Sequence, residues 1–411
     1  MPLRAVIFDL DDTLLDSSGL RADRKAHNWR EALARLDEVS EFEVTDGEPQ
    51  VTELPRLARE RGLTVGVLTQ SPRAYATELL RAHGIAVESM VSGSDGYPRK
   101  PDPTGLNALL AELGVAAADA LLVGDSVLDF EAAAAAGVTS TGVAWSRATP
   151  VAWLHSWPDV AVAKPSRLVR LLDGDEGLGA WAEVVAAGGD PRAHWGSLMR
   201  LGGSSFGLGR YFPMGDARYP GHELSHLVLR AKSEPTAAEE VAAIFGTLAE
   251  KLTSGPTPEL VLSVPPEPDG YDRFALARAV LAQVWEARDG GGLLTMNHTV
   301  EDYKHVARED RARRNTERFE CAPLDRERVV LIDDVLTSGG QSEACRQAIT
   351  AAGGGPVTIL VLSVTQDKLT ESCPLCGANL RTFSRHSDGH EFIGCGAWRL
   401  TGCPYTRDIE V

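Results

Sequence analysis

Short apolar runs alternate with amphipathic stretches over the first 170 or so residues. The apolar runs are four to five residues long and end in polar clusters, as buried parallel strands do. The amphipathic stretches have the spacing of helices that cover a sheet. The predicted strands are 4–8, 64–68 and 120–123, and the predicted helices are 74–83 and 130–136. This alternation predicts a doubly wound parallel sheet in a first domain, residues 1–174.

The same pattern returns in the second half of the chain. A Gly- and Asp-rich stretch, 173–177, indicates a boundary, and we predict a connecting segment over 175–204. A second α/β domain is predicted over 205–370 and a small module over 371–411. The predicted strands of the second α/β domain are 259–264, 328–332 and 357–364, and its predicted helices are 272–287 and 341–352. The predicted fold class is therefore α/β, with two doubly wound Rossmann-like domains and a small third module.

Composition narrows the class of protein. The chain has 411 residues, of which 43% are hydrophobic and 24% charged, as in ordinary globular proteins. No apolar stretch approaches the roughly 20 residues of a membrane span, so we expect no membrane partner and a cytoplasmic location. The formal net charge of -17 argues against broad binding to nucleic acid, although a local site remains possible.

Two aspartates follow the first predicted strand. Attack on a phosphate ester needs a nucleophile and a proton donor for the leaving oxygen. Asp9 is expected to attack phosphorus and to form an aspartyl-phosphate, and Asp11 to protonate the leaving group and later to activate water. The sequence thus predicts a phosphatase site at this strand end.

Later segments supply the other parts of such a site. Thr69 follows the second predicted strand and Lys100 lies in a polar loop, so both are expected to bind the phosphoryl oxygens. Asp125 and Asp129 follow the third predicted strand, where oxygen ligands suit Mg²⁺. The predicted magnesium ligands are Asp9, Asp11, Asp125 and Asp129.

These four elements in order resemble the haloacid dehalogenase superfamily of phosphohydrolases over about residues 1–172. The resemblance implies that Asp9 is the nucleophile, Asp11 the acid and base, Thr69 and Lys100 phosphate binders, and Asp125 a magnesium ligand supported by Asp129. The insert between the first two elements, about 16–55, is short for a cap. A reduced cap suggests an open site that admits a bulky substrate or a polymer end.

A second acidic pair belongs to the second predicted domain. Asp333 and Asp334 end an apolar run, and small residues follow before a helix. Backbone amides of small residues can close around a phosphate at a helix N-terminus, while the acids contact ribose hydroxyls or magnesium. This pattern resembles the signature of type I phosphoribosyltransferases. The residues expected to bind phosphoribosyl pyrophosphate are Asp333, Asp334, Thr337, Ser338, Gly339, Gly340, Ser263 and Val264.

Further segments resemble the ComF-type branch of that family over about 205–366. Residues 218–232 are similar to its entry segment and 308–315 to its mobile basic loop. Where the branch carries Arg-Gly-Phe-Asn-Gln, this chain has residues 272–275, with Arg273 and Phe274 similar. The identity of the acceptor is therefore left open. A second open alternative is that the domain keeps the fold and binds the sugar phosphate without transferring it.

His222, Glu223 and His226 fit a zinc-protease pattern of two histidines one helical turn apart. Such a site needs a third ligand, for which Glu239 or Glu240 is available. The competing interpretation places this helix in the entry segment of the second domain. We favour that interpretation and expect the histidines to be surface or core residues.

Four of the six cysteines have the spacing of a metal site. Cys373 and Cys376 form a close pair, and Cys395 and Cys403 follow, so four thiolates are available for a structural Zn²⁺. The segment resembles the C-terminal zinc ribbons of bacterial topoisomerases, which contact single-stranded DNA. Its aromatic residues, Phe383, Phe392, Trp398 and Tyr405, are either stacking platforms for bases or packing around the zinc.

Together the motifs predict a bifunctional phosphate-handling enzyme. We expect a Mg²⁺-dependent phosphatase that acts on a phosphorylated small molecule or nucleotide, joined to a phosphoribosyltransferase that also uses Mg²⁺. The two can act in sequence on one product. The alternative is a nucleic-acid processing, repair or DNA-uptake factor in which the phosphatase trims ends and the zinc ribbon binds a single strand.

Overall fold

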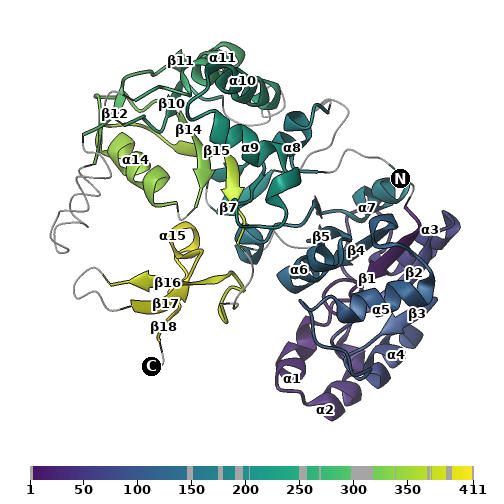
Figure 1. The fold of residues 1–411 in the computed structure, drawn as a ribbon. Coiled ribbons are helices and arrows are strands. Elements are labelled where there is room, and N and C mark those ends of the chain that lie inside the picture. Colours follow the sequence, from purple (N-terminus) through teal and green to yellow (C-terminus); the bar gives the residue numbers. More distant parts are fainter. Residues whose placement is uncertain are drawn as a thin grey trace. The chain divides into compact units, whose positions relative to one another are not determined.

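In the computed structural model the chain forms two compact units, residues 1–179 and 180–411 (Figure 1). Within them the structure describes residues 3–145, 151–174, 179–189, 198–202, 204–249, 257–267, 270–297, 318–337, 339–367, 371, 373–385 and 391–409. No helix in these ranges combines the length and the apolar character that a membrane crossing requires.

A six-stranded, wholly parallel sheet forms the centre of the first unit, in the order β3-β2-β1-β4-β5-β6. The order reverses direction between β1 and β4, and such a switch point is where open α/β sheets bind ligands. The strands are β1 (Ala5–Phe8), β2 (Thr64–Leu68), β3 (Ser89–Val91), β4 (Ala120–Gly124), β5 (Thr139–Val143) and β6 (Val160–Val162). The prediction of a parallel α/β sheet in this part of the chain is confirmed.

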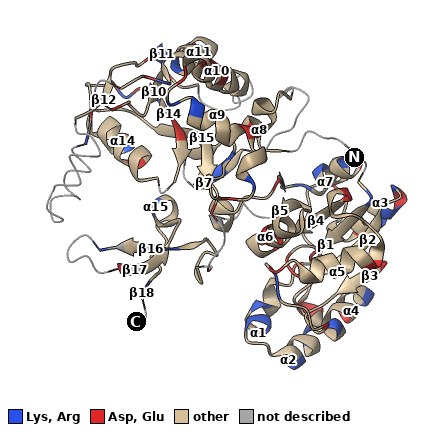
Figure 2. Cartoon of the chain, in the orientation of Figure 1, with Lys and Arg blue, Asp and Glu red and all other residues tan. Residues whose placement is uncertain are grey.

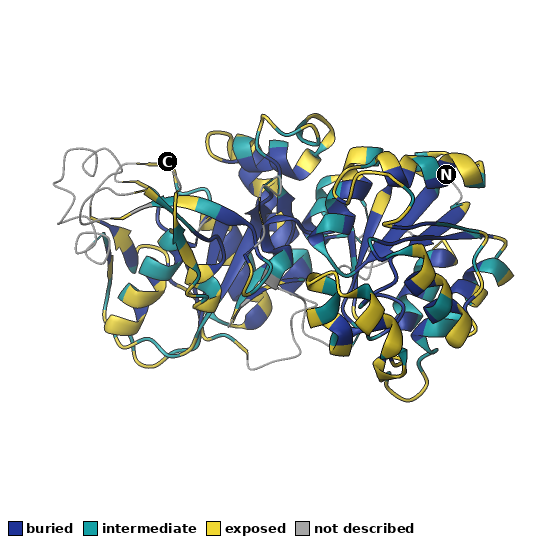
Figure 3. Ribbon diagram, turned by 90° about the horizontal axis from the view of Figure 1, so that it is seen from below, coloured by how far each residue is buried: buried dark blue, intermediate teal, exposed yellow. Residues whose placement is uncertain are grey.

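Helices cover both faces of this sheet. Alternate residues of each strand point to opposite faces, so Val6 and Phe8 join one apolar core while Ala5 and Ile7 join the other. The strands are buried and the outer helix faces exposed (Figure 3). The helices are α1 (Arg21–Lys25), α2 (Trp29–Ala34), α3 (Leu54–Glu60), α4 (Arg73–Ala82), α5 (Thr104–Leu113), α6 (Val127–Ala136) and α7 (Pro165–Leu172).

Local signals explain where α6 begins and ends. Ser126 and Asp129 form a capping box, in which each side chain bonds the backbone of the other. Gly137 follows the helix with a φ of 70°, a left-handed conformation that glycine adopts without steric cost. The helix therefore starts three residues earlier than the predicted 130–136, and its first turn carries Asp129 beside the end of β4.

The second unit contains a mostly parallel sheet in the order β11-β10-β14-β15-β8-β7, with β9 also paired to β15. Of the strands that the structure describes in this sheet, β7 and β8 alone pair antiparallel. Its strands are β7 (Met199–Gly202), β8 (Ser205–Gly207), β9 (Arg210–Tyr211), β10 (Leu260–Ser263), β11 (Arg288–Asp289), β14 (Val329–Leu336) and β15 (Val357–Thr365). The prediction of a second α/β sheet is confirmed at this level.

Among the described residues, five α-helices belong to the second unit outside its C-terminal segment. Buried side chains of the first four, among them Ala182, Leu224, Phe245 and Leu281, share one apolar core with the sheet. The helices are α8 (Trp181–Ala186), α9 (Glu223–Arg230), α10 (Pro235–Ala249), α11 (Ala275–Trp285) and α14 (Gly340–Ala351). The segment predicted as a connector, 175–204, thus contributes α8 and β7 to this unit.

The acidic strand β14 is longer than its sequence pattern predicts. The apolar run ends at Ile332, but pairing with β15 continues to Leu336, opposite Val364. On the other side, β10 stops at Ser263, opposite Ile332. Asp333 and Asp334 therefore do not lie beyond the strand: they are part of it, at the point where its β10 side becomes free.

Two small antiparallel sheets complete the second unit. One pairs β12 (Leu294–Met296) with β13 (Phe319–Cys321). The other is formed by β16 (Leu380–Ser384), β17 (Glu391–Cys395) and β18 (Thr406–Asp408), with the short helix α15 (Trp398–Thr401) between the last two strands. This C-terminal sheet carries the cysteines of the predicted third module.

Candidate active site

The sequence-predicted residues of the first unit meet at the carboxyl edge of its sheet. Parallel strands end at the same edge, so loops after β1, β2 and β4 converge there. Asp9 continues β1, and its backbone N–H donates to the carbonyl oxygen of Val123 in β4 at 2.8 Å. These loops surround a cavity of about 410 Å³, whose lining includes Asp9, Asp11, Thr69, Lys100 and Asp125.

Lys100 lies at the centre of this cluster. Its Nζ donates to Oδ1 of Asp9 at 2.6 Å, to Oδ1 of Asp129 at 2.5 Å and to the carbonyl oxygen of Leu68 at 3.2 Å. All three charged side chains are buried. Burial by itself would lower the pKa of Lys100, but Asp129 and Asp9 outweigh it and raise this pKa. The lysine is therefore held as a cation between two carboxylates.

The cluster contains more negative charge than Lys100 neutralises. Burial raises the pKa of Asp9 to about 7, and the charge of Asp129 adds to the effect while Lys100 opposes it. Burial and the charges of Asp9 and Asp129 raise the pKa of Asp125 well above its usual range. A further cation at this position would relieve the repulsion between the three carboxylates.

Three of the four predicted magnesium ligands are close enough to hold one ion. Carboxylate oxygens of Asp9, Asp125 and Asp129 lie within 4.8 Å of one another. Oxygen ligands of this kind suit Mg²⁺, so the donor set and its excess charge both fit that ion. Thr13 lies beside them, its Oγ1 3.4 Å from Oδ2 of Asp9 and 3.4 Å from Oδ1 of Asp125.

The side chain of Asp11 is directed elsewhere. Its Oδ2 accepts a hydrogen bond from Oγ of Ser71 at 2.6 Å, its Oδ1 accepts one from the hydroxyl of Tyr75 at 3.1 Å, and Nη1 of Arg24 lies 3.4 Å from the same oxygen. Asp11 is also a predicted magnesium ligand, but its carboxylate is not part of the cluster that Asp9, Asp125 and Asp129 form. The carboxylate instead faces the cavity beside the phosphate-binding segment, where Oγ1 of Thr69 accepts from the N–H of Ser71 at 3.1 Å.

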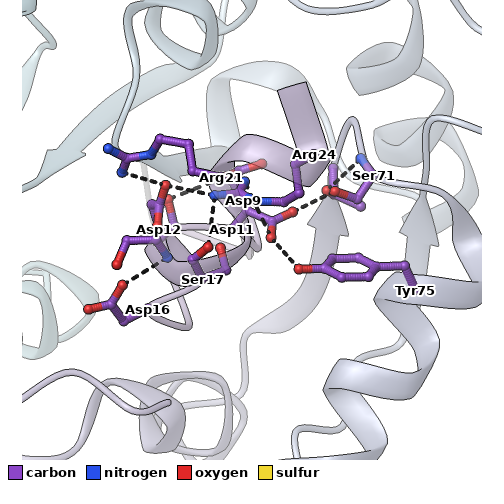
Figure 4. Close-up of polar contacts among 12 residues, drawn as sticks. Asp9, Asp11, Asp12, Asp16, Ser17, Arg21, Arg24, Ser71 and Tyr75 are labelled. Carbon is purple, nitrogen blue, oxygen red and sulfur yellow. Dashed lines mark hydrogen bonds and ion pairs between the residues drawn. The ribbon is translucent and has the colours of Figure 1, made fainter. Parts of the chain in front are cut away.

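Asp12, Arg21 and Arg24 form a group that the sequence analysis does not identify. Oδ2 of Asp12 accepts from Nη2 of Arg21 at 2.9 Å and from Nη2 of Arg24 at 3.0 Å. Figure 4 shows both arginines reaching toward Asp12, while Ser71 and Tyr75 point to Asp11. The arginines belong to α1, inside the predicted short cap, where basic residues gather (Figure 2). The basic run 21–25 is the signal that could have indicated them.

In the second unit, Asp333 and Asp334 are both buried. Oδ2 of Asp333 accepts from Oγ of Ser342 at 3.0 Å, and Oδ2 of Asp334 lies 2.9 Å from Nη2 of Arg273. Burial raises the pKa of Asp333 to about 7, and the adjacent Asp334 adds to the effect. One of the two similar residues of the altered acceptor segment, Arg273, thus contacts the acidic pair directly.

The small-residue loop after β14 leads into a helix N-terminus, as predicted. Gly339 precedes α14 with a φ of 73°, so this position favours glycine, and Gly340 is the first helical residue. Oγ1 of Thr337 lies 3.2 Å from Oγ1 of Thr365 in β15. Ser338 lies outside the described residues, as does the predicted basic loop 308–315.

The predicted pyrophosphate loop follows β10. The N–H of Val264 donates to the carbonyl oxygen of Ile332 at 2.9 Å, which aligns this loop with β14. Oγ of Ser263 accepts from the buried Arg278 at 2.6 Å, and Arg278 also pairs with Asp272 at 2.8 Å. A cavity of about 310 Å³ opens here, lined by Ser263, Pro265, Pro266, Glu267, Gly270, Asp272, Arg278, Gly290, Gly291, Gly292, Leu294, Thr295 and Met296.

The two histidines of the zinc-protease pattern have other roles in this fold. His222 precedes α9 as its N-cap, its Nδ1 accepting from the N–H of Ser225 at 3.2 Å. The ring of His226 lies against Tyr219, with centroids 4.5 Å apart. Among the described residues, neither histidine takes part in a cluster of three potential metal ligands. The preference for structural roles agrees with this geometry.

The four predicted zinc ligands come together in the C-terminal sheet. The Sγ atoms of Cys373, Cys376, Cys395 and Cys403 all lie within 4.8 Å of one another. The Cys373–Cys403 separation is 3.8 Å and the Cys376–Cys395 separation 3.4 Å. Tetrahedral zinc with Zn–S bonds of about 2.3 Å separates its sulfurs by about 3.8 Å, so the four thiols are compatible with that ion.

Comparison with known proteins concerns the first unit. Residues 37–137 match the family model of haloacid dehalogenase-like hydrolases. Phosphoglycolate phosphatase of Rhodospirillum rubrum is 37% identical over 133 residues, which are 32% of this chain and 50% of that protein. The chain therefore spans half the length of that relative.

Longer similarities involve the same kind of protein. Phosphoglycolate phosphatase of Yersinia pseudotuberculosis is 35% identical over an alignment of 207 residues, covering 39% of this chain and 89% of that protein. The crystal structure of a HAD phosphatase from Thermococcus onnurineus has 20% sequence identity and a TM-score of 0.35, and covers 42% of this chain and 99% of that chain.

Proposed function

Since the chain belongs, through its first unit, to the haloacid dehalogenase-like hydrolases, we propose that this unit hydrolyses small phosphate monoesters through a covalent intermediate on Asp9. The observation that carries the proposal is the buried contact of Asp9 with Lys100, beside Asp125 and Asp129, at the switch point of the sheet. The similarity to phosphoglycolate phosphatases favours a small organic phosphate as substrate.

The reaction has two steps. A carboxylate oxygen of Asp9 attacks phosphorus, a new O–P bond forms, and the bond to the ester oxygen breaks as Asp11 donates a proton to that oxygen. Asp11 then takes a proton from water, which attacks the phosphorus of the aspartyl-phosphate and releases inorganic phosphate. Ser71 and Tyr75 orient the carboxyl group of Asp11 for both transfers.

Two further groups act on the transferring phosphoryl oxygens. Asp9, Asp125 and Asp129 are the residues that would hold Mg²⁺, which when bound neutralises charge on those oxygens. Lys100 supplies a fixed positive charge at Asp9, and Thr69 lines the same cavity. Together these residues orient the phosphate for attack by Asp9.

Phosphate release from a panel of sugar phosphates, nucleotides, 2-phosphoglycolate and 3′- or 5′-phosphorylated oligonucleotides tests this proposal. We expect Mg²⁺-dependent hydrolysis, which Asp9→Asn lowers by roughly a thousandfold or more because the nucleophile is lost. Asp37→Asn is the matched control, since Asp37 is exposed and does not line the cavity. Undiminished activity of the Asp9→Asn protein would rule out the proposed intermediate.

For the second unit we propose binding of phosphoribosyl pyrophosphate and transfer of its phosphoribosyl group. Three features support this assignment: the buried acids of β14, the glycine turn before α14 and the loop after β10. Because β10 and β14 are parallel neighbours, the acids, the first N–H groups of α14 and this loop lie toward the same end of the sheet. The acceptor is left open. A product of this transfer would itself be a phosphate ester for the first unit.

Calorimetric titration with phosphoribosyl pyrophosphate and Mg²⁺ tests the second assignment. We expect Asp334→Asn to weaken binding by about tenfold, because a carboxylate that contacts ribose or its magnesium is lost. Asp325→Asn, in an exposed loop, is the control.

Accumulation of a phosphorylated ribosyl product by the Asp9→Asn protein would support action of the two units in sequence. Product release that the Asp9→Asn change leaves unaltered would contradict it.

A second candidate function rests on the C-terminal sheet. A cavity of about 660 Å³ is lined there by aromatic and basic residues together, a combination that suits single-stranded nucleic acid. These residues are Phe383, Arg385, Phe392, Trp398, Arg399, Tyr405 and Arg407. Salt-dependent binding of a labelled oligonucleotide, lost in Trp398→Ala and kept in the exposed Leu375→Ala, would favour the nucleic-acid processing alternative.

A further inference from the structure

The residue that follows the acid and base of the first unit has an unusual backbone. Asp12 has a φ of 61°, in the left-handed region where a side chain other than that of glycine costs about 1 kcal/mol. Its Oδ2 is held by two guanidinium groups, at 2.9 Å from Arg21 and 3.0 Å from Arg24. Burial would raise the pKa of Asp12, but Arg24 and Arg21 hold it below its ordinary value. The two arginines thus hold Asp12 as an ionised carboxylate.

Both arginines line the cavity that contains Asp9 and Asp11. Arg21 is 44% exposed and Arg24 15% exposed, so one lies at the rim and the other further inside. Nε of Arg24 is buried and has no hydrogen-bond partner among the described residues. Each guanidinium has five N–H donors. Arg24 directs Nη2 to Asp12 and to the carbonyl oxygen of Ser17, and Nη1 to Asp11. Arg21 contacts Asp12 through Nη2 and keeps more of its donors available.

The wall formed by α1 is positively charged. Besides Arg21 and Arg24 it includes Lys25, with His27 in the turn that follows, whereas Asp12 is the acid that the two arginines share. Arg99 lines the cavity from the loop before Lys100. Arg21 and Arg24 are partly neutralised by Asp12, and Arg24 also lies 3.4 Å from Asp11, whereas Lys25 and Arg99 form no ion pair among the described residues. This wall of the cavity thus keeps excess positive charge, which suits a substrate with a second negative group.

The geometry identifies the kind of group. Arg21 and Arg24 already hold one carboxylate, that of Asp12, and the planar guanidinium group matches the two oxygens of a carboxylate. We propose that Arg21 and Arg24 form a subsite for a carboxylate at the far end of the phosphate ester, and that Asp12 is the positioning residue that orients both guanidinium groups. The proposal rests on the phosphatase function of the same cavity and names its substrate class, phosphorylated carboxylic acids.

Two esters of nearly equal size test the subsite. 2-Phosphoglycolate carries a carboxylate where ethyl phosphate carries a methyl group, so the ratio of their kcat/KM values isolates the second anion. We expect Arg21→Gln to lower this ratio by about tenfold, mainly through KM for 2-phosphoglycolate. Arg24→Gln should lower the ratio similarly and also lower kcat for both esters, because Arg24 contacts Asp11. Arg30→Gln, on α2 and outside the cavity, should leave the ratio unchanged.

Changes at Asp12 separate positioning from folding. Glycine adopts the left-handed backbone without strain, so Asp12→Gly should fold and still lose selectivity for 2-phosphoglycolate. Asp12→Asn tolerates the same backbone and keeps one oxygen as an acceptor, so it should retain more selectivity than Asp12→Gly. Equal effects of these changes on both esters would contradict the positioning role.

Binding measurements distinguish failure of the subsite from failure of the phosphatase. Calorimetric titration of the Asp9→Asn protein with 2-phosphoglycolate and Mg²⁺ reports on the subsite without turnover. Added to that protein, Arg21→Gln should weaken binding by about tenfold. Unchanged affinity would overturn the subsite, whereas failure of the unaltered protein to hydrolyse either ester would overturn the phosphatase and leave the binding result to decide the subsite.

Discussion

Single residues of the first site are placed with little spare room, and Gly124 is an example. A Cβ at this position would lie 2.4 Å from Cγ of Asp129 and 2.5 Å from its Oδ2. Asp129 also holds Lys100, which in turn contacts Asp9. The absence of one methyl group at the end of β4 is therefore a condition for the whole charge network.

We expect Gly124→Ala to lower kcat for phosphate esters by about a hundredfold and stability by about 1–3 kcal/mol, because Asp129 must shift away from Lys100. Phosphate release and urea unfolding of the full chain measure the two effects. Gly19→Ala is the matched control, since a Cβ there meets its nearest neighbour, Glu38, at an ordinary 3.5 Å. Similar activity of the two variants would show that the network tolerates displacement of Asp129.

At the scale of elements, α8 is fixed to the second unit by one carboxylate. Glu183 accepts from the backbone N–H of Arg210 at 2.8 Å and from its side chain at 2.9 and 3.0 Å, and Nε2 of His222 lies 3.4 Å away. Burial would raise the pKa of Glu183, but Arg210 and His222 outweigh it and lower the pKa to about 2. The helix is thus joined to β9 and to the start of α9.

This shift gives stability a defined dependence on pH. The pKa of Glu183 is lower in the folded protein than the ordinary 4.5 of a glutamate, so its contribution to stability is complete above about pH 4.5 and is lost as pH falls toward 2. Glu183→Gln should lower the free energy of unfolding by about 3 kcal/mol at pH 7 and by much less at pH 3. Urea unfolding at several pH values measures this difference.

Glu223→Gln, at the exposed first residue of α9, controls for the loss of one charge in the same region. A difference between the Glu183→Gln protein and the unaltered chain that stays constant from pH 7 to pH 3 would argue against an ionised, buried carboxylate. In that case Glu183 would stabilise α8 mainly through packing.

At the scale of the whole molecule, the chain joins the unit with the proposed phosphatase site to a unit that contains a cluster of four thiols. The four thiols of the C-terminal sheet and the acids of the first site belong to different compact units. A sheet of three short strands buries too little apolar surface for stability on its own, so a bound metal would supply folding energy to that segment alone.

Cys403→Ser should therefore abolish zinc binding and make the C-terminal sheet sensitive to protease, while the phosphatase activity remains within about twofold of the unaltered value. Metal analysis, limited proteolysis and phosphate release measure the three quantities. Cys321→Ser is the control, because Cys321 lies outside the thiol cluster. A parallel loss of phosphatase activity would reveal coupling between the units.

Much of this fold and of the first site follows from local sequence. An apolar run is nearly sufficient to predict the position of a buried strand, and β2 lies at its predicted bounds, 64–68. Polar residues that directly follow such runs must lie at one sheet edge, which is why Asp9, Thr69 and Asp125 were predicted and meet in one cavity. The close spacing of Cys373 and Cys376 predicted a metal cluster for a similar reason.

Contacts between distant segments had no such local signal. β14 extends past its apolar run because β15 pairs with it to Leu336, and strand pairing depends on the partner rather than on the strand's own sequence. Asp11 faces Ser71 and Tyr75 instead of the metal cluster, and Asp12 meets Arg21 and Arg24, because side-chain direction is set by the backbone after β1. The sequence by itself determined which segments form the buried strands and which polar residues lie at the edge of the sheet, since both depend on residue type and short spacing. Only the tertiary structure decided which acid faces which cation, because that choice depends on burial and on distances between residues far apart in the chain.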